Sequence, residues 1–152
     1  MSRLRKFLAL PAPERRVLLA ATLLLPTVRL ALSILPFRTM RRFVTRLARA
    51  RSDAPLASPP SPASVGWAVR TAGRYVPSGG NCLAQALTAH VLLRRLGHPS
   101  RLRLGVARGA ARPFEAHAWI ESGAAVPVGA TGMMLYTPLP AFALFELGEE
   151  TR

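Results

Sequence analysis

The pattern of apolar positions predicts a helical first third of the chain. Pro13 and Glu14 suit the first turn of a helix, where a missing N–H costs nothing and a negative charge meets the positive end of the dipole. We expect this helix to stop near Pro26 and a second helical piece to run to about Leu35, because proline removes a helical hydrogen bond. The apolar stretch between residues 17 and 35 is therefore predicted to be a buried helical hairpin.

Two further helices and a linker follow. Residues 37–50 read as a basic amphipathic helix with four apolar side chains on one side, namely Met40, Phe43, Val44 and Leu47. Residues 52–62 are rich in proline and serine and read as an extended linker, and residues 64–75 as a helix. This divides the chain into a basic helical region (1–51), a linker (52–62) and a core (63–152).

The segment from Asn81 to Gly97 has the start, spacing and stop of a helix. Asn81 is a favoured N-cap, residues 82–96 place apolar side chains at helical spacing, and Gly97 is a usual terminator. A turn at residues 77–80 precedes it. Cys82 is thus expected in the first turn of a helix.

After Gly97 the hydrophobic period changes from 3.6 to 2. Residues 101–106 and 114–121 alternate apolar and polar positions, which is typical of strands. Ser122 and Gly123 form a short turn into residues 126–128, so the second strand should pair antiparallel with a third. The second part of the chain therefore combines helices with a small antiparallel sheet.

The net charge of +14 is unevenly distributed, since residues 1–51 carry twelve basic side chains and one acid, Glu14. Such a field attracts nucleic acid, anionic lipid or an acidic peptide alike, but the arginines lack the interleaved aromatics or known motif of a nucleic-acid module. Arg29 and Pro26 interrupt the apolar stretch, so a membrane span is disfavoured. We expect this stretch to be buried in the protein without membrane contact, and peripheral membrane contact is the alternative.

Cysteine content limits the chemistry further. The single cysteine, Cys82, excludes an internal disulfide and a cysteine-rich zinc site, and fits a reducing cytoplasm. A helix N-terminus favours the thiolate form of a cysteine and presents free N–H groups to a developing oxyanion. Taken alone, a buried structural cysteine is the commoner case.

Three histidines could serve Cys82 as a base. His90 lies about 12 Å along the same helix at 1.5 Å per residue, and His98 is farther, so both are expected to be packing or surface residues. His117 lies in a different element, as the base of a nucleophile often does. Spacing alone leaves a Cys82–His117 dyad and a structural histidine equally open.

The residues around this pair resemble the lasso-peptide biosynthesis leader peptidases. The resemblance covers about residues 60–140 and rests on Gly-Asn-Cys82-Leu-Ala-Gln-Ala-Leu, Ala-His117-Ala-Trp-Ile-Glu and Tyr-Thr-Pro-Leu139, in that order and spacing. It implies an α+β fold with a papain-like or transglutaminase-like core, in which a helix bearing Cys82 packs on a small antiparallel sheet bearing His117, preceded by a helical region.

One departure from this family concerns the third catalytic residue. Its members usually carry an aspartate about a dozen residues after the histidine, where this chain has Gly129, and the only aspartate here is Asp53 in the linker. Glu121 shares the face of His117 but lies some 13 Å along the strand at about 3.3 Å per residue. We expect a backbone carbonyl or a water to orient His117, or one of Glu146, Glu149 and Glu150 to fold back.

The resemblance also implies the reaction and the partners. Cys82 would attack the carbonyl at the leader/core junction and form a thioester, with His117 as base and no cofactor or metal. The flanking amides Asn81 and Gln85, or Gly129, would orient the histidine or bind the oxyanion, and an aspartate at position 129 would raise activity. The implied partners are the precursor leader, a separate leader-recognition protein and a macrolactam synthetase.

Several alternatives stay open. Trp119 would shield the site or line the peptide cleft, although a plain core aromatic is equally compatible with its position. Another transglutaminase-like amidase or acyltransferase is the enzymatic alternative. A catalytically inactive scaffold that binds an acidic peptide partner through the basic helices is the alternative without catalysis.

Overall fold

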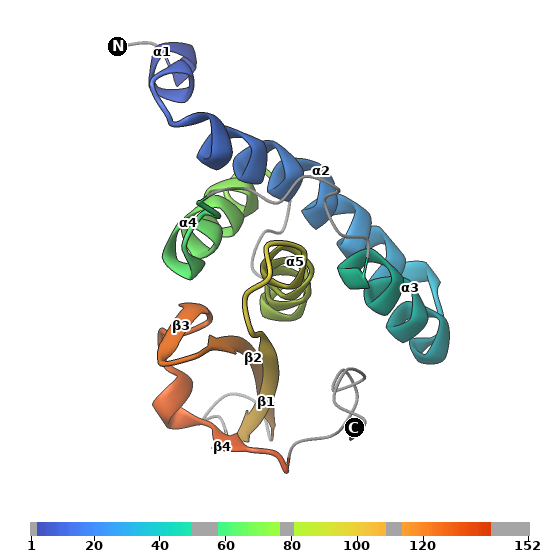
Figure 1. Ribbon diagram of the computed structural model, residues 1–152. Coiled ribbons are helices and arrows are strands. Elements are labelled where there is room, and N and C mark those ends of the chain that lie inside the picture. Colours follow the sequence, from blue (N-terminus) through green and yellow to red (C-terminus); the bar gives the residue numbers. More distant parts are fainter. Residues whose placement is uncertain (1–2, 50–57, 77–80, 109–113, 141–152) are drawn as a thin grey trace, which may run out of the picture.

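Helices and a four-stranded sheet form the chain, which is therefore α+β as predicted (Figure 1). The computed structural model describes residues 3–49, 58–76, 81–108 and 114–140. The helices are α1 (Arg3–Leu8), α2 (Ala12–Ile34), α3 (Phe37–Arg49), α4 (Pro62–Gly73), α5 (Cys82–Arg95) and the 3₁₀ turn η1 (Met133–Leu135). The strands are β1 (Arg101–Ala107), β2 (Glu115–Ser122), β3 (Ala125–Val128) and β4 (Thr137–Pro138).

Helix α5 is the centre of the molecule. It begins at Cys82 with Asn81 as its N-cap, and Gly97 follows its C-cap with a φ of 83°. These bounds confirm the predicted helix and its start. Almost every residue from Ala84 to Leu93 is buried, because α2, α3 and α4 pack around the helix and the sheet packs beneath it (Figure 1). The middle of α5 is therefore enclosed by the core, whereas Cys82 and Leu83 at its start are partly exposed and Arg94 and Arg95 at its end are exposed.

The sheet has the order β3-β2-β1-β4 and is antiparallel throughout, which confirms the predicted strands and the predicted pairing of β2 with β3. In β2, Ala118 and Ile120 belong to the same core cluster as the side chains of α5. His117 and Trp119 occupy the alternate row, because successive side chains of a strand point to opposite faces. Strand β4 carries no apolar alternation and was not predicted. It adds to the edge of β1 opposite Gly105 and Val106.

Helix α2 corrects the predicted hairpin, because it runs unbroken from Ala12 to Ile34 with Pro26 inside it. One face stays buried on both sides of the proline, through Val17, Ala21, Leu25, Val28 and Ala31. An interior proline costs about 3 kcal/mol, whereas full burial of each Val or Leu side chain contributes about 1.5–3 kcal/mol. Pro26 itself is exposed, so water can solvate the carbonyl that loses its partner. The burial of α2 against α4 and α5 therefore outweighs the cost of the interior proline.

The basic region and the predicted core share one hydrophobic cluster. Helix α3 turns Met40 and Val44 inward, as its pattern predicts, and leaves most of its arginines exposed. Residues 52–57 of the predicted linker lie outside the described residues. At its end Ser61 caps α4, so Pro62 is the first residue of a helix and not linker. The N-terminal helices thus contribute to the packing that positions α5.

Candidate active site

Cys82 is the first residue of α5 and is partly exposed. The Asn81 side-chain oxygen accepts hydrogen bonds from the N–H groups of Leu83 (3.1 Å) and Ala84 (3.3 Å). Asn81 therefore caps the helix and occupies two of the donors in its first turn. The Cys82 N–H and the Asn81 amide nitrogen are the donors near the thiol that this cap does not use, and an oxyanion site here would rely on them.

Gln85 lies one turn after Cys82 and lines a small pocket at the start of α5. Asn81 and Ala84 form the pocket from α5, Leu25 and Arg29 from α2, and Val76 from the segment after α4. Both amides proposed from the sequence line this pocket, whereas Cys82 is not among its lining residues. Their participation in oxyanion binding stays a prediction.

His117 is held by a backbone carbonyl. Its Nε2 lies 2.9 Å from the carbonyl oxygen of Gly129, which can only accept a hydrogen bond, so Nε2 carries the proton. In the neutral imidazole this leaves Nδ1 unprotonated and able to act as a base. Gly129 follows His117 by twelve residues, the place where the resembling family carries an acid. A carbonyl here makes the contact that an orienting aspartate would make.

The backbone at Gly129 shows why an acid does not stand there. Its φ is +82°, and a Cβ atom would lie 2.6 Å from both the Ala118 carbonyl oxygen and the Trp119 Cβ. Any other residue would be strained in conformation and would press against β2. The expectation that an aspartate at this position would raise activity stays a prediction, and the lack of space for a side chain argues against it.

Aromatic rings surround the imidazole. Trp119 and Tyr136 both stack on it roughly in parallel, with ring centroids 6.1 Å and 5.0 Å from that of His117. Gly105 lies opposite His117 in the register and leaves space for the Trp119 and Tyr136 side chains. A Cβ at Gly105 would lie only 2.9 Å from each of these two side chains. Tyr136 was missed as a site residue, although the Tyr-Thr-Pro element that contains it was the available signal.

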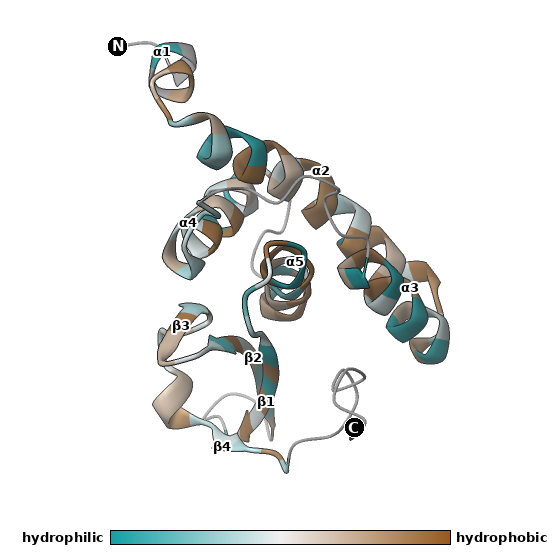
Figure 2. Cartoon of the chain, in the orientation of Figure 1, coloured by the Kyte–Doolittle hydropathy of each residue, from teal (hydrophilic) through white to brown (hydrophobic). Residues whose placement is uncertain are grey.

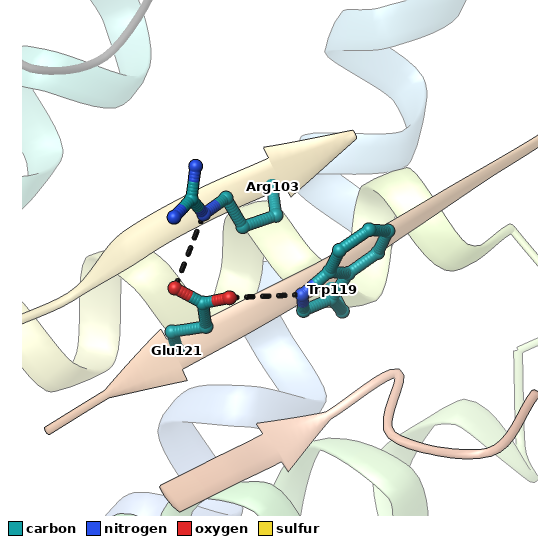
Figure 3. A network of polar contacts seen from close by, with 3 residues as sticks. All are labelled: Arg103, Trp119 and Glu121. Carbon is teal, nitrogen blue, oxygen red and sulfur yellow. Dashed lines mark hydrogen bonds and ion pairs between the residues drawn. The ribbon is translucent and has the colours of Figure 1, made fainter. Parts of the chain in front are cut away.

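A polar network fixes Trp119 on this face (Figure 3). The indole Nε1 donates to one oxygen of Glu121 at 3.3 Å, and Arg103 donates from Nε to the other oxygen at 3.1 Å. Trp119 is only 4% exposed, so its indole does not line an open cleft. Glu121 is used in this network, in agreement with the expectation that it lies too far along the strand to orient His117.

The elements that carry Cys82 and His117 pack on each other, but the imidazole is not in the row of β2 that faces α5. Helix α5 packs against β2, yet it does so over the row of Ala118 and Ile120, whereas the imidazole belongs to the row of Trp119. Among the described residues no hydrogen bond joins the thiol to the imidazole. The dyad itself stays a prediction, and Glu146, Glu149 and Glu150 lie outside the described residues.

Comparison with known proteins identifies the family. The model of the transglutaminase-like superfamily matches residues 22–141, from the middle of α2 to just beyond β4. The chain belongs to the transglutaminase-like superfamily. No curated protein and no solved structure matches it. The superfamily includes cysteine peptidases, which supports chemistry of the peptidase or acyltransferase type and gives no support to one particular substrate.

The other two histidines of this transglutaminase-like domain have structural contacts. His90 is buried in α5 with Nδ1 3.0 Å from the Ser100 hydroxyl, and burial, assisted by the charge of Arg94, lowers its pKa from 6.5 to about 4. His98 Nε2 lies 2.7 Å from the Pro60 carbonyl oxygen and donates to it. Both contacts agree with the expectation that these are packing or surface residues.

The family assignment does not test the prediction that this protein binds no metal. The described part of the chain contains no cluster of three or more His, Cys, Asp or Glu side chains that could hold an ion.

Proposed function

We propose that this transglutaminase-like protein is a cysteine peptidase that removes the leader from a lasso-peptide precursor, with Cys82 as nucleophile and His117 as base. The observation that carries the proposal is the hydrogen bond from His117 Nε2 to the Gly129 carbonyl, which leaves Nδ1 as the basic nitrogen. The family assignment and the position of Cys82 at the capped start of α5 add support. The dyad is not formed in this structure, where the imidazole lies in the row of β2 that faces away from α5, so the proposal requires Cys82 or His117 to move when substrate binds.

The reaction has two steps. His117 Nδ1 takes the Cys82 proton as the sulfur attacks the carbonyl at the leader/core junction, and the Cys82 N–H and the Asn81 amide nitrogen stabilise the oxyanion. The imidazolium then protonates the departing core amine, which leaves the leader as a thioester on Cys82. Water, deprotonated by His117, attacks the thioester and releases the leader carboxylate and the thiol.

The partners follow from the resemblance in the sequence. A separate small protein would recognise the leader and deliver the junction to Cys82. A macrolactam synthetase would join the freed core amine to a side-chain carboxylate. Both partners and the precursor would meet this protein in the cytoplasm, where a single unpaired cysteine stays reduced.

The test is a cleavage assay with the precursor peptide, the leader-recognition protein and this protein, read by mass spectrometry. Wild type should release leader and core of complementary mass, and Cys82→Ala should release neither, with an unchanged unfolding temperature because it deletes little volume. Hydroxylamine added to wild type should capture the leader as its hydroxamate, as a thioester intermediate requires.

Each alternative gives a different result in the same assay. Transfer of the leader to an added amine in preference to water indicates an acyltransferase. Processing that continues undiminished with Cys82→Ala indicates a scaffold that assists another enzyme, and the peptidase proposal is then wrong.

A further inference from the structure

The outer face of α2 carries an exposed row of large apolar side chains. Leu23, Leu30 and Ile34 are 72%, 61% and 67% exposed, and Leu19 is about half exposed. Their spacing of four, seven and four residues places them along one side of the helix, opposite the face that packs on α4 and α5. We call these four residues the α2 ridge. It extends for about 22 Å at 1.5 Å per residue.

This ridge is not explained by the fold. A helix that packs on a domain needs one apolar face, and the face through Val17, Leu25 and Val28 already fulfils that need. Figure 2 shows α2 hydrophobic along most of its length, at the margin of the helical layer. By length and composition α2 could cross a membrane. Only 28% of its most apolar window is buried inside the protein, so most of this apolar surface is not used by the core. Contiguous exposed apolar surface of this kind marks an interaction site.

The charges beside the ridge select the partner. Arg16 is exposed before Leu19, and Arg38 and Arg42 are exposed just after the end of α2. Within α2 and α3 the only acid is Glu14, which accepts a hydrogen bond from the Ser64 hydroxyl. A second copy of the chain would bring these arginines against their equivalents, so self-association through the ridge is disfavoured. The complementary surface is apolar and negatively charged.

We propose that the α2 ridge docks this protein, lying in the plane of the interface, on an anionic lipid bilayer. Apolar side chains would enter the headgroup and acyl boundary, while the arginines at both ends reach the lipid phosphates. A row of exposed apolar side chains along one helix suits a flat, deformable bilayer, whereas a protein groove would have to match its individual side chains. The opposite face remains packed on α4 and α5, so α2 lies on the membrane and does not span it. This proposal is independent of the peptidase assignment.

The test is flotation of the purified full-length protein with two kinds of vesicle, one of phosphatidylcholine alone and one also containing phosphatidylglycerol. Wild type should float with the anionic vesicles at low salt and be released by high salt. Leu23→Gln with Leu30→Gln should weaken this binding at least about tenfold, since two of the inserted side chains become polar. The matched control, Met134→Gln with Leu135→Gln, alters two apolar residues on η1 that are even more exposed and should bind as wild type does.

A second pair of variants tests the charges. Arg38→Gln with Arg42→Gln should weaken binding to anionic vesicles several-fold, whereas Arg94→Gln with Arg95→Gln, exposed at the far end of α5, should change it less. Circular dichroism confirms that each variant is folded. If the Leu23/Leu30 variant is not folded, the variant Leu19→Gln with Ile34→Gln takes its place and should lose binding to the anionic vesicles in the same way.

The proposal is overturned by any of three results. Wild type fails to float with anionic vesicles, the ridge variants float as well as wild type, or the η1 control loses as much binding as they do. A wild type that stays in solution while the ridge variants lose binding to the leader-recognition protein would assign the ridge to a protein partner. Resistance to both high salt and alkaline carbonate would indicate a spanning helix and would equally contradict docking in the plane.

Discussion

Two histidines on facing elements of this fold have opposite surroundings. His90 lies in the middle of α5, enclosed by the core, with one ring nitrogen on the Ser100 hydroxyl. His117 lies near the start of β2, partly exposed, with Nε2 on the Gly129 carbonyl and two aromatic rings stacked on it. Both are tied down by a hydrogen bond, but only His117 is also reachable from solvent.

The difference separates a histidine that stabilises from one that can react. Burial keeps His90 neutral down to about pH 4, so it exchanges no proton in the physiological range. His117 combines a fixed tautomer with access, which a general base requires.

Replacing His117 with Ala should reduce precursor cleavage by about a thousandfold or more, because the variant lacks the base and residues that act as one unit are not additive. His98→Ala is the matched control, since His98 also donates Nε2 to a backbone carbonyl but contacts Pro60. Initial rates from mass spectrometry, corrected for the folded fraction, give the comparison. Equal losses in both variants would remove the distinction between the histidines.

Gly129→Ala should destabilise the protein and slow cleavage at the same time. The new Cβ meets Ala118 and Trp119, so the carbonyl that holds His117 must move. We expect a loss of roughly 1–3 kcal/mol in the free energy of unfolding and about a tenfold lower rate.

Gly132→Ala provides the control for this effect. Gly132 has a similar φ of +76°, but a Cβ there meets nothing within 4 Å. Gly132→Ala should lower the free energy of unfolding, because alanine is strained at this φ, but it should leave the cleavage rate unchanged. Denaturant unfolding measures the first effect and the same cleavage assay the second. A Gly132 variant that loses as much activity as the Gly129 variant would show that the carbonyl is not special.

His90 should act on stability alone. Between pH 6.5 and about 4 the unfolded chain binds a proton at this residue that the folded chain excludes, so stability falls as the pH drops through this window. The lowered pKa of His90 accounts for a loss of roughly 3 kcal/mol at most in the free energy of unfolding across this window. His90→Gln should flatten this part of the stability curve and leave cleavage at pH 7 unchanged. An unaltered pH slope in denaturant unfolding would contradict the burial of a neutral imidazole.

Local signals were enough to predict the elements around the site. Asn81 and Gly97 mark the ends of α5, and the strict alternation in β1 and β2 specifies a sheet with His117 and Trp119 in one row. These features depend on neighbours in the sequence, where capping and periodicity are decided. The site residues Cys82 and His117 could therefore be assigned to a helix start and a strand from the sequence alone.

Features that depend on distant packing could not be predicted in the same way. Pro26 is tolerated within α2 because α4 and α5 hold the helix on both sides of it, and no local rule contains that energy. The stacking of Tyr136 on His117 requires β4 to pair with β1, although two residues carry too little pattern to identify a strand. The orienting role of the Gly129 backbone leaves no side-chain signal in the sequence.

The central claim, that Cys82 and His117 act together, is tested most directly by the reactivity of the thiol. Cys82 is the only cysteine, so the mass added by iodoacetamide to the folded protein reports on it alone. The account predicts that wild type is alkylated at neutral pH at least about tenfold faster than His117→Ala, while His98→Ala reacts as wild type does. Equal alkylation rates in wild type and His117→Ala would contradict it.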